Sequence, residues 1–379
     1  MCMSTINNVL IVGGGIGGLA AATALRRSGV RVEIVEVKQE WTVAGVGIIQ
    51  PSNALRALEY IGVAEKCIQA GRPFPGWQLF NSKGDLLAEV PTPQAEGSTC
   101  PPNNGITRPA LHNILSAAAV EAGASIRLGM SVETIVSAED SATVTFTDGT
   151  SASYDLVIGA DGIYSKVRGM VFGDLKPEFV GEAVWRFTTK RPKDMDWGGI
   201  YFAKGSKAGL VPLDDELMYL FLVTPEPGNP RKAEHELHTL LRQHLNEYEG
   251  VVGRLAEDLL DPAQVIYKPI ETIYVAGPWH RGRVVLLGDA VHAASPHLGA
   301  GAAMAVEDAV LLSELITTQA ELEHALAAYS ERRKPRCFLV SNASRQLIEW
   351  ELKEWAGKHP SGNPGEIFTH ALNELAKPF

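Results

Sequence analysis

The chain has 379 residues, of which 45% are hydrophobic and 21% charged, and its formal net charge is −10. This is the composition of a folded globular protein with room for two domains. The acidic balance and the short, diluted lysine and arginine runs argue against a nucleic-acid-binding surface, and the longest apolar run, residues 9–25, is broken by glycines and too short to cross a membrane.

The first elements in the chain predict a parallel βαβ unit. Residues 9–12 form a short apolar run typical of a buried strand, residues 18–28 have a helical pattern, and residues 30–36 alternate towards a second strand. Such a unit implies a right-handed crossover within a parallel sheet. A further helix is expected at residues 51–61.

The middle of the chain has a different pattern. Asp-Gly and Lys-Gly-Asp turns stand between alternating runs at residues 76–90 and 144–162, which favours hairpins. The remaining elements that the pattern predicts are a helix at 111–122, a strand-rich region at 180–225, a helix at 233–246, a strand at 283–287, and helices at 307–319 and 325–347. A β-rich middle between two nucleotide-binding-type ends indicates one domain interrupted by another.

The cysteines indicate the compartment. Cys2, Cys67, Cys100 and Cys337 are widely spaced, without a CxxC pair or a histidine at zinc-ligand spacing. We therefore expect free thiols, as in a reducing compartment, and no metal site. No charged segment precedes the first apolar run as it would in a signal peptide, so we expect a cytoplasmic protein.

Glycine occupies five of the six positions from 13 to 18, between the first strand and the first helix. The spacing Gly13-x-Gly15-x-x-Gly18 allows a tight turn, close approach of a pyrophosphate, and close packing of helix on strand. The helix N-terminus also offers N–H groups to phosphate. Glu36 ends the second strand, where a carboxylate accepts hydrogen bonds from ribose hydroxyls. The sequence therefore predicts a bound dinucleotide, either NAD or the adenosine half of FAD.

Two further stretches favour FAD. In "DLVIGADGIYSKVR" (155–168) an apolar strand runs into Asp161 and Gly162. Within residues 282–312 a strand ends at Asp289, and a glycine-rich segment then enters a helix. An aspartate at the end of a strand can bind a polyol such as a ribityl chain, and the helix start offers N–H groups to an electron-rich flavin edge.

With these three stretches the chain resembles the class A flavoprotein aromatic hydroxylases, of the para-hydroxybenzoate and salicylate hydroxylase type. The resemblance runs over residues 8–329 and includes "ITRPALHNIL" (106–115) and "PHLGAG" (296–301), the latter most like salicylate-hydroxylase-type members; 6-hydroxynicotinate hydroxylases are also similar. It implies an α/β (α+β composite) fold, in which a Rossmann-like FAD-binding domain is interrupted by a β-sheet substrate domain and followed by C-terminal helices.

We accordingly expect six segments in the chain. They are the first part of the FAD-binding domain (1–72), strands of the substrate domain (73–105), the second FAD part (106–178), the β-rich substrate domain (179–275), the third FAD part (276–345) and a C-terminal helical tail (346–379) that serves packing or dimer formation.

The resemblance also implies which residues bind FAD. The glycines of the first turn would hold the pyrophosphate, Glu36 the ribose, Arg108 the phosphate and ribityl region, and Asp289 the ribityl chain. The full set is Gly13, Gly15, Gly17, Gly18, Glu36, Val37, Lys38, Gly47, Arg108, Asp161, Asp289, Pro296, Gly299, Gly301 and Ala302. We expect the flavin to be held noncovalently.

The implied activity is a monooxygenation. NADH or NADPH reduces FAD, and a flavin C4a-hydroperoxide hydroxylates a small hydroxylated aromatic or N-heteroaromatic compound. We expect the partners to be this substrate, O2 and NAD(P)H, without nucleic acid or membrane, in a monomer or homodimer. The alternatives are other flavin chemistry, such as epoxidation or halogenation, and a non-catalytic flavin-bound redox sensor.

Candidate catalytic residues are His297 as a base, Arg186 as a ligand for a carboxylate or phenolate, and Tyr219 as a phenol relay. The predicted substrate-binding set is Gln50, Arg186, Tyr201, Tyr219, Pro296 and His297. Arg186 could instead form a salt bridge at a sheet edge, and Tyr201 and Tyr219 could be core or pocket wall. We interpret His292 as a packed residue behind the site.

Overall fold

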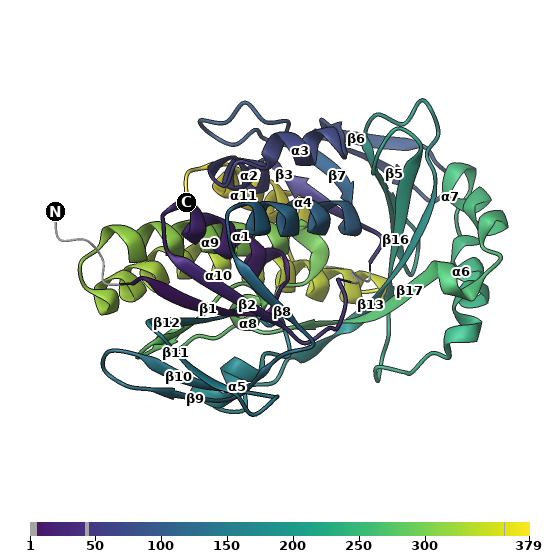
Figure 1. Cartoon of the computed structure of the whole chain (residues 1–379). Helices are drawn as coiled ribbons and strands as arrows, with labels where there is room; N and C mark the ends of the chain where they lie inside the picture. The colour runs from purple at the N-terminus through teal and green to yellow at the C-terminus, as the bar shows by residue number, and fades with distance from the viewer. Residues whose placement is uncertain (1–5, 42–44, 360) are drawn as a thin grey trace.

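In the computed structural model, which describes residues 6–41, 45–359 and 361–379, a six-stranded sheet takes its strands from residues 8–36, 125–159 and 280–286 (Figure 1). Five of its strands are parallel, and a short sixth strand is antiparallel. The order is β18 (His280–Arg281), β19 (Val284–Leu286), β12 (Leu156–Gly159), β1 (Asn8–Val12), β2 (Arg31–Glu36) and β8 (Ser125–Leu128).

Helices cover one face of this sheet because its parallel strands are apolar on both faces. Figure 1 shows these helices on one side and a small three-stranded sheet on the other. The helices are α1 (Ile16–Arg27), α4 (Arg108–Glu121), α9 (Gly301–Thr318) and α10 (Leu322–Trp355), and the small sheet consists of β9 (Val132–Ser137), β10 (Ala142–Phe146) and β11 (Ser151–Tyr154).

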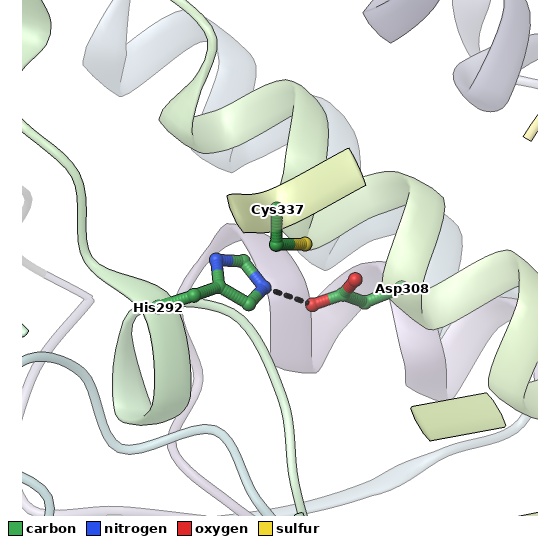
Figure 2. Close-up of side chains that lie close together, drawn as sticks. All are labelled: His292, Asp308 and Cys337. Atoms are coloured by element: carbon green, nitrogen blue, oxygen red, sulfur yellow. Dashed lines mark hydrogen bonds and ion pairs between the residues drawn. The ribbon is translucent and has the colours of Figure 1, made fainter. Parts of the chain in front are cut away.

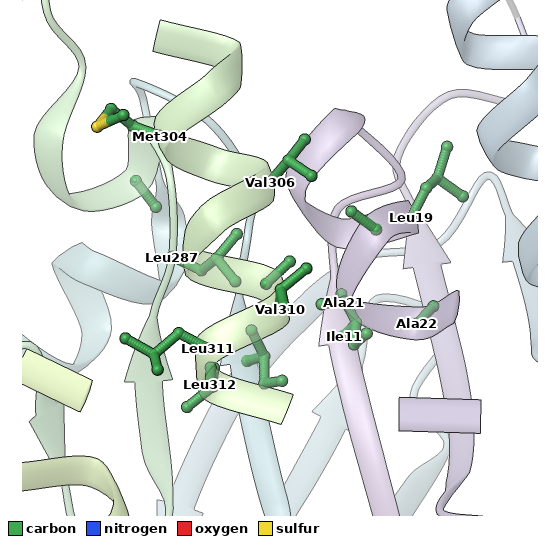
Figure 3. Packing of buried hydrophobic residues seen from close by; sticks show 14 of the residues in the cluster. Ile11, Leu19, Ala21, Ala22, Leu287, Met304, Val306, Val310, Leu311 and Leu312 are labelled. Carbon is green, nitrogen blue, oxygen red and sulfur yellow. The ribbon is translucent and has the colours of Figure 1, made fainter. Parts of the chain in front are cut away.

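Small residues let α1 and α9 approach each other closely. Ala21 of α1 is fully buried beside Val310 of α9, as Figure 3 shows. A Cβ at Gly17 would lie only 2.6 Å from Leu287 and 3.3 Å from the Cβ of Ala305, so a larger residue would push the helix away. This packing fixes the start of α1 against the end of β19.

The second large sheet has seven strands and is built mainly from the middle of the chain. Its two N-terminal strands form the predicted hairpin at residues 76–90, and β14 joins them in parallel. The order is β17 (Val265–Thr272), β13 (Glu178–Lys190), β16 (Leu217–Pro225), β15 (Lys207–Pro212), β14 (Gly198–Phe202), β5 (Gly76–Asn81) and β6 (Leu86–Pro91).

Successive side chains on these strands point to opposite faces. On the outer face, Trp185, Leu220 and Leu222 are fully buried in one apolar cluster with Leu241 and Val252. The helices that supply the last two residues are α6 (Leu237–Leu245) and α7 (Gly250–Arg254), followed by 3-10 turns at Leu255–Asp258 and Pro262–Gln264. The inner face is left to line a cavity.

The remaining elements connect the two large sheets. They are a third sheet of β3 (Gly47–Pro51), β7 (Asn103–Thr107) and β4 (Arg72–Phe74), the helices α2 (Ser52–Tyr60), α3 (Ala64–Gln69), α5 (Lys166–Phe172), α8 (Asp289–His292) and α11 (Pro364–Ala376), and the 3-10 turns η1 (Glu234–Glu236) and η4 (Pro296–Leu298). The predicted fold class, a mixed α/β architecture with C-terminal helices, is confirmed. No helix in the described part of the chain combines the length and apolar character needed to cross a bilayer.

Candidate active site

The predicted glycine turn joins β1 to α1. Gly13 has a φ of 110°, and a Cβ there would lie 2.4 Å from the carbonyl oxygen of Ala160. A Cβ at Gly18 would lie 2.0 Å from the carbonyl oxygen of Gly13. At Gly15 the same test meets no atom within 4 Å. Two glycines therefore close the turn, and the third leaves open space at the start of α1, where N–H groups and the helix dipole favour phosphate.

Glu36 lies across this turn at the end of β2. Its carboxylate accepts hydrogen bonds from the backbone N–H of Gly14, at 2.9 Å, and of Lys38, at 3.0 Å. Val37 and Lys38 follow on the surface, and Val37 is 66% exposed. The carboxylate is thus held at the carboxyl edge of the parallel strands, the edge at which open α/β sheets bind nucleotides.

Asp161 has a local structural role. Its carboxylate accepts hydrogen bonds from the Ser165 hydroxyl at 2.5 Å and from the backbone N–H of Lys166 and Val167 at 2.7 and 3.1 Å. Burial raises its pKa, against these hydrogen bonds, which lower it. The carboxylate therefore holds the start of α5, and direct contact with FAD stays a prediction for this residue.

Asp289 begins α8 just beyond the end of β19. Its side chain is exposed to solvent, yet the surrounding protein raises its pKa by desolvation, against the charges of His292 and Arg108. The carboxylate is thus accessible to solvent, while the protein atoms around it are close enough to desolvate it. Its oxygens accept no hydrogen bond from another residue that the structure describes.

A buried charge cluster holds α8 in place (Figure 2). Asp308 of α9 lies 2.6 Å from Nε2 of His292 and accepts a hydrogen bond of 3.0 Å from the backbone N–H of Gly288. Nε of Arg333 donates to its other oxygen at 2.6 Å. Burial alone would raise the pKa of Asp308, but His292 and Arg333 lower it to about 2. The predicted packing role of His292 agrees with this arrangement.

The glycine-rich entry to α9 lies beside η4. Gly299 is left-handed, with a φ of 62°, and a Cβ at Gly301 would meet no atom within 4 Å. Pro296 is exposed, and Ala302 is half-buried. The first turn of α9 therefore leaves its backbone open at Gly301.

Arg108 lies between Asp289 and the inner face of the seven-stranded sheet. Its side chain lies so close to Gly45 that a Cβ there would come within 2.2 Å of it. The charge of Arg108 lowers the pKa values of Asp289, Arg186 and Tyr219, so all three lie within its electrostatic reach.

A cavity of about 280 Å³ lies between the inner face of that sheet, β3, η4 and the helices α10 and α11. Arg186 of β13 and Tyr219 of β16 line it. The pKa of Arg186 is lowered by burial and by Arg108, and burial raises the pKa of Tyr219 to about 12. Neither side chain hydrogen-bonds to another described residue. The alternative of a sheet-edge salt bridge for Arg186 finds no partner among the described residues.

His297 also lines the cavity, but protein groups face both of its ring nitrogens. Nδ1 lies 2.9 Å from the Ser295 hydroxyl, and Nε2 lies 3.2 Å from an oxygen of Glu351 and 3.2 Å from one of Glu182. Lys207 forms a short ion pair with Glu351. Burial and Lys207 lower the pKa of His297, yet the two glutamates outweigh them, so the net shift is upward. The ring is therefore held between β13 and α10, in surroundings that favour its protonated form.

Two predicted substrate residues lie elsewhere. Tyr201 points to the outer face of the sheet, where it stacks on Phe80 with ring centroids 4.6 Å apart, while its neighbour Ile200 lines the cavity. Gln50 is 2% exposed, and its side-chain oxygen accepts a hydrogen bond of 2.8 Å from Asn104 behind β3. We correct both assignments, because strand alternation directs these side chains away from the cavity.

Sequence reasoning missed two parts of the site. The first part is the set of charged residues around His297, which come from three separate segments: Glu182, Lys207 and Glu351. Of these, Glu182 lies on the same strand face as Arg186, so the period of two in a strand could have identified it. The other part is the C-terminal helix α11, which covers the cavity. The pattern of that tail carries no signal of what it packs on.

Two clusters have the composition of metal sites, His292 with Asp308 and Cys337, and Glu182 with His297 and Glu351. In each, a protein cation already contacts a carboxylate, Arg333 in the first and Lys207 in the second. Cys67, Cys100 and Cys337 are free and buried, and Cys2 lies outside the described residues.

The glycine turn, Glu36, Asp289 and the start of α9 together fit FAD. Open backbone at two helix starts matches a pyrophosphate and a flavin edge, Glu36 matches a ribose, and the unpaired carboxylate of Asp289 matches a ribityl chain. The guanidinium of Arg108 adds a cation within electrostatic reach of Asp289 and of the cavity residues Arg186 and Tyr219.

Comparison with known proteins agrees with this fit. Residues 7–344 match the family described as "FAD binding domain". The putative FAD-dependent monooxygenase YetM of Bacillus subtilis is 35% identical over 351 residues, which cover 92% of this chain and 95% of that protein. The 2-heptyl-3-hydroxy-4(1H)-quinolone synthase of Pseudomonas aeruginosa is 32% identical over 349 residues, 90% of each chain.

Solved structures share the fold. Klebsiella pneumoniae HpxO, in complex with FAD and uric acid, superposes with a TM-score of 0.85 at 24% identity, over 97% of this chain and 96% of that one. A tetrameric form of 2-methyl-3-hydroxypyridine-5-carboxylic acid oxygenase gives a TM-score of 0.80 at 25% identity, over 98% and 96%. The chain therefore belongs to the FAD binding domain family and is an FAD-dependent monooxygenase of the aromatic hydroxylase type.

Proposed function

We propose that the substrate is an aromatic or N-heteroaromatic ring that carries an acidic hydroxyl group. The observation that carries this proposal is the pair of Arg186 and Tyr219 on one wall of an apolar cavity, with no carboxylate bound to Arg186 among the described residues. A guanidinium in apolar surroundings favours an anionic oxygen as its partner. Relatives named for urate, a quinolone and a hydroxypyridine support a heterocyclic ring.

The overall reaction uses NADH or NADPH and O2 and leaves water. When bound, FAD would take a hydride from the nicotinamide and activate O2, so that one oxygen atom is inserted into a ring C–H bond as a hydroxyl group and the other leaves as water. Arg186 stabilises the anionic ring oxygen, which makes the ring more electron-rich. The Tyr219 phenol, protonated at neutral pH because its pKa is about 12, donates a hydrogen bond to the same oxygen. The apolar walls exclude water.

We assign His297 a positioning role within this proposal. Accepting the substrate's proton directly would require His297 to break its contact with Ser295 or with the two glutamates. As a cation it instead ties η4, which carries Pro296, to Glu182 of the sheet and Glu351 of α10. The proposed acceptor of the substrate's hydroxyl proton is then solvent rather than this imidazole.

A substrate screen tests the proposal. Hydroxybenzoates, hydroxypyridines and hydroxyquinolines are added to the FAD-loaded protein, NADH and NADPH oxidation is followed, and products are identified by mass spectrometry. At least one class should stimulate oxidation and yield a hydroxylated ring. Stimulation only by rings without an acidic oxygen would contradict the proposal. Light scattering on the same sample tests the proposed monomer or homodimer, since one relative is named as tetrameric.

A further inference from the structure

The floor of the cavity is wider than one ring. Its lining comes from β13 and β16 at one side and from β14, β5 and β6 at the other. Four steps along the sheet separate β13 from β5, which corresponds to about 19 Å at the usual strand spacing of about 4.8 Å. A single ring held by Arg186 and Tyr219 covers little more than one of these steps.

The far side of the cavity is apolar. The aliphatic and aromatic side chains that line it from β5, β6, β14 and α11 include Leu79, Val90, Ile200, Phe368 and Leu372. Of the charged residues in the lining, Arg186 lies on the opposite side, on β13, and Lys207 and Glu351 form an ion pair with each other. The amide NH2 of Asn103 donates to Thr92 at 2.8 Å, so the Thr369 hydroxyl, the Asn103 amide oxygen and the Trp77 indole N–H are the few polar groups on this part of the described lining.

Helix α11 is a fixed wall rather than a loose end of the chain. Arg56 donates hydrogen bonds to the carbonyl oxygens of Ala376 and Lys377, at 2.9 and 2.6 Å. Arg336 donates to those of Glu374 and Leu375, at 2.9 and 2.6 Å. Two guanidinium groups thus hold the C-terminal turn of α11, and Leu372, 9% exposed, is directed into the cavity.

We infer that the substrate is amphiphilic, with a hydrocarbon chain that extends from its ring across β14 and β5 and lies under α11. This inference rests on the proposed function and narrows its substrate class. A chain that ends in a charged or hydrogen-bonding group would lose its hydration and find few partners on these walls. A hydrocarbon chain gains the free energy of leaving water, which at about 0.8 kcal/mol per CH₂ is roughly a fourfold gain in affinity for each carbon.

The test is a chain-length series on the FAD-loaded wild-type protein. The probes are 4-hydroxyquinoline and its 2-propyl, 2-pentyl and 2-heptyl derivatives, together with a 2-heptyl derivative whose chain ends in a carboxylate. Kd is read from the change in flavin absorption on binding. We expect Kd to fall at least tenfold from the unsubstituted ring to the pentyl compound, and the carboxylate to remove that gain. A Kd that is independent of chain length, or rises with it, would overturn the inference.

A matched pair of variants locates the chain. Leu372→Gln puts an amide on the cavity wall, and Asn373→Gln puts the same group on the exposed side of α11. Leu372→Gln should raise the Kd of the heptyl compound about tenfold and leave that of the unsubstituted ring unchanged, while Asn373→Gln changes neither. Equal weakening of both compounds by Leu372→Gln would contradict the location.

The two proposals fail in different ways. If hydroxylated rings stimulate NAD(P)H oxidation but chain length has no effect on Kd, the inference is wrong and the proposed function stands. If no hydroxylated ring stimulates oxidation, the proposed function is wrong whatever the binding series shows.

Discussion

At the scale of single residues, the site depends on which carboxylates have protein partners. Asp308 is bound by His292, Arg333 and the backbone of Gly288, whereas Asp289 at the start of α8 has none among the described residues. The two aspartates lie in different surroundings, since Asp308 is fully buried and Asp289 is exposed. The paired one holds the structure, and the unpaired one is available to a ligand.

Asp289→Ala should weaken FAD binding rather than unfold the protein. The change removes a charged acceptor worth about 1.5–3 kcal/mol, or about one to two decades in Kd. Asp289→Asn, which keeps an acceptor oxygen, should lose less. Fluorescence titration of the apoprotein with FAD measures both values, and an unchanged Kd for the alanine variant would refute the assigned contact.

Asp308→Asn should act on stability instead. It leaves the buried His292 without its counter-ion and Arg333 with Glu307 alone, at a cost of about 3–5 kcal/mol in the free energy of unfolding at pH 7. Because the pKa of Asp308 is lowered to about 2, its contribution is fully present above about pH 4 and is lost as the pH falls towards 2. The variant should therefore lose less stability than wild type between pH 5 and pH 3.

Urea unfolding over this pH range checks the prediction, with Asp140→Asn on an exposed turn as the control. Parallel stability curves for wild type and Asp308→Asn would show that the aspartate does not carry the acid sensitivity.

Arg186→Ala should raise the KM for the ring by about one to two decades, with FAD still bound, because a charge-assisted contact in the ground state is lost. Arg186→Lys should recover part of the loss, since it restores the charge without the planar donor geometry. Steady-state kinetics on both variants decide. A fall in kcat with an unchanged KM would place the ring elsewhere.

At the scale of elements, η4 joins the cavity wall to the glycine-rich start of α9. Its His297 is held by Glu182 of β13 and Glu351 of α10, so a single imidazolium joins three segments that are far apart in the chain. Helix α11 then closes the cavity over these residues. We expect this junction to set how well the oxygen atom reaches the ring instead of escaping as peroxide.

His297→Gln should keep FAD and substrate binding but release more hydrogen peroxide per NAD(P)H oxidised. In wild type the pKa of His297 is raised, so the clasp is complete at low pH and is lost as the pH rises through that pKa, above the ordinary value of about 6.5. Peroxide release should therefore increase with pH in wild type and not in the variant. Peroxide assays across this range test the effect, and identical pH profiles would contradict the role.

The sequence allowed the local parts of this site to be predicted, but not the contacts between distant segments. The glycine turn, Glu36 and Asp289 each follow a strand, and a strand end has a fixed place in a parallel sheet. The face on which Tyr201 and Gln50 lie depends on strand register, which one residue of shift reverses. The partners of His297 and the cover formed by α11 depend on long-range packing, which has no periodic signature in the chain.

At the scale of the whole molecule, the chain crosses between the two large sheets several times. The six-stranded sheet takes strands from residues 8–36, 125–159 and 280–286, and the seven-stranded sheet from residues 76–91 and 178–272. The glycine turn, Glu36 and Asp289 lie at the carboxyl edge of the first sheet, and the cavity lies on the inner face of the second. Arg108 lies between them, within electrostatic reach of Asp289 on one side and Arg186 on the other.

From this arrangement we propose that oxygen from O2 is transferred to a ring held beside Arg186. The most direct test is turnover under ¹⁸O₂ with the best ring compound from the screen, followed by mass spectrometry of the product. We expect the hydroxylated product to carry a single ¹⁸O atom, in a yield that matches the NAD(P)H consumed apart from a minor peroxide fraction. NAD(P)H oxidation that yields peroxide alone, or a product whose new oxygen comes from water, would contradict it.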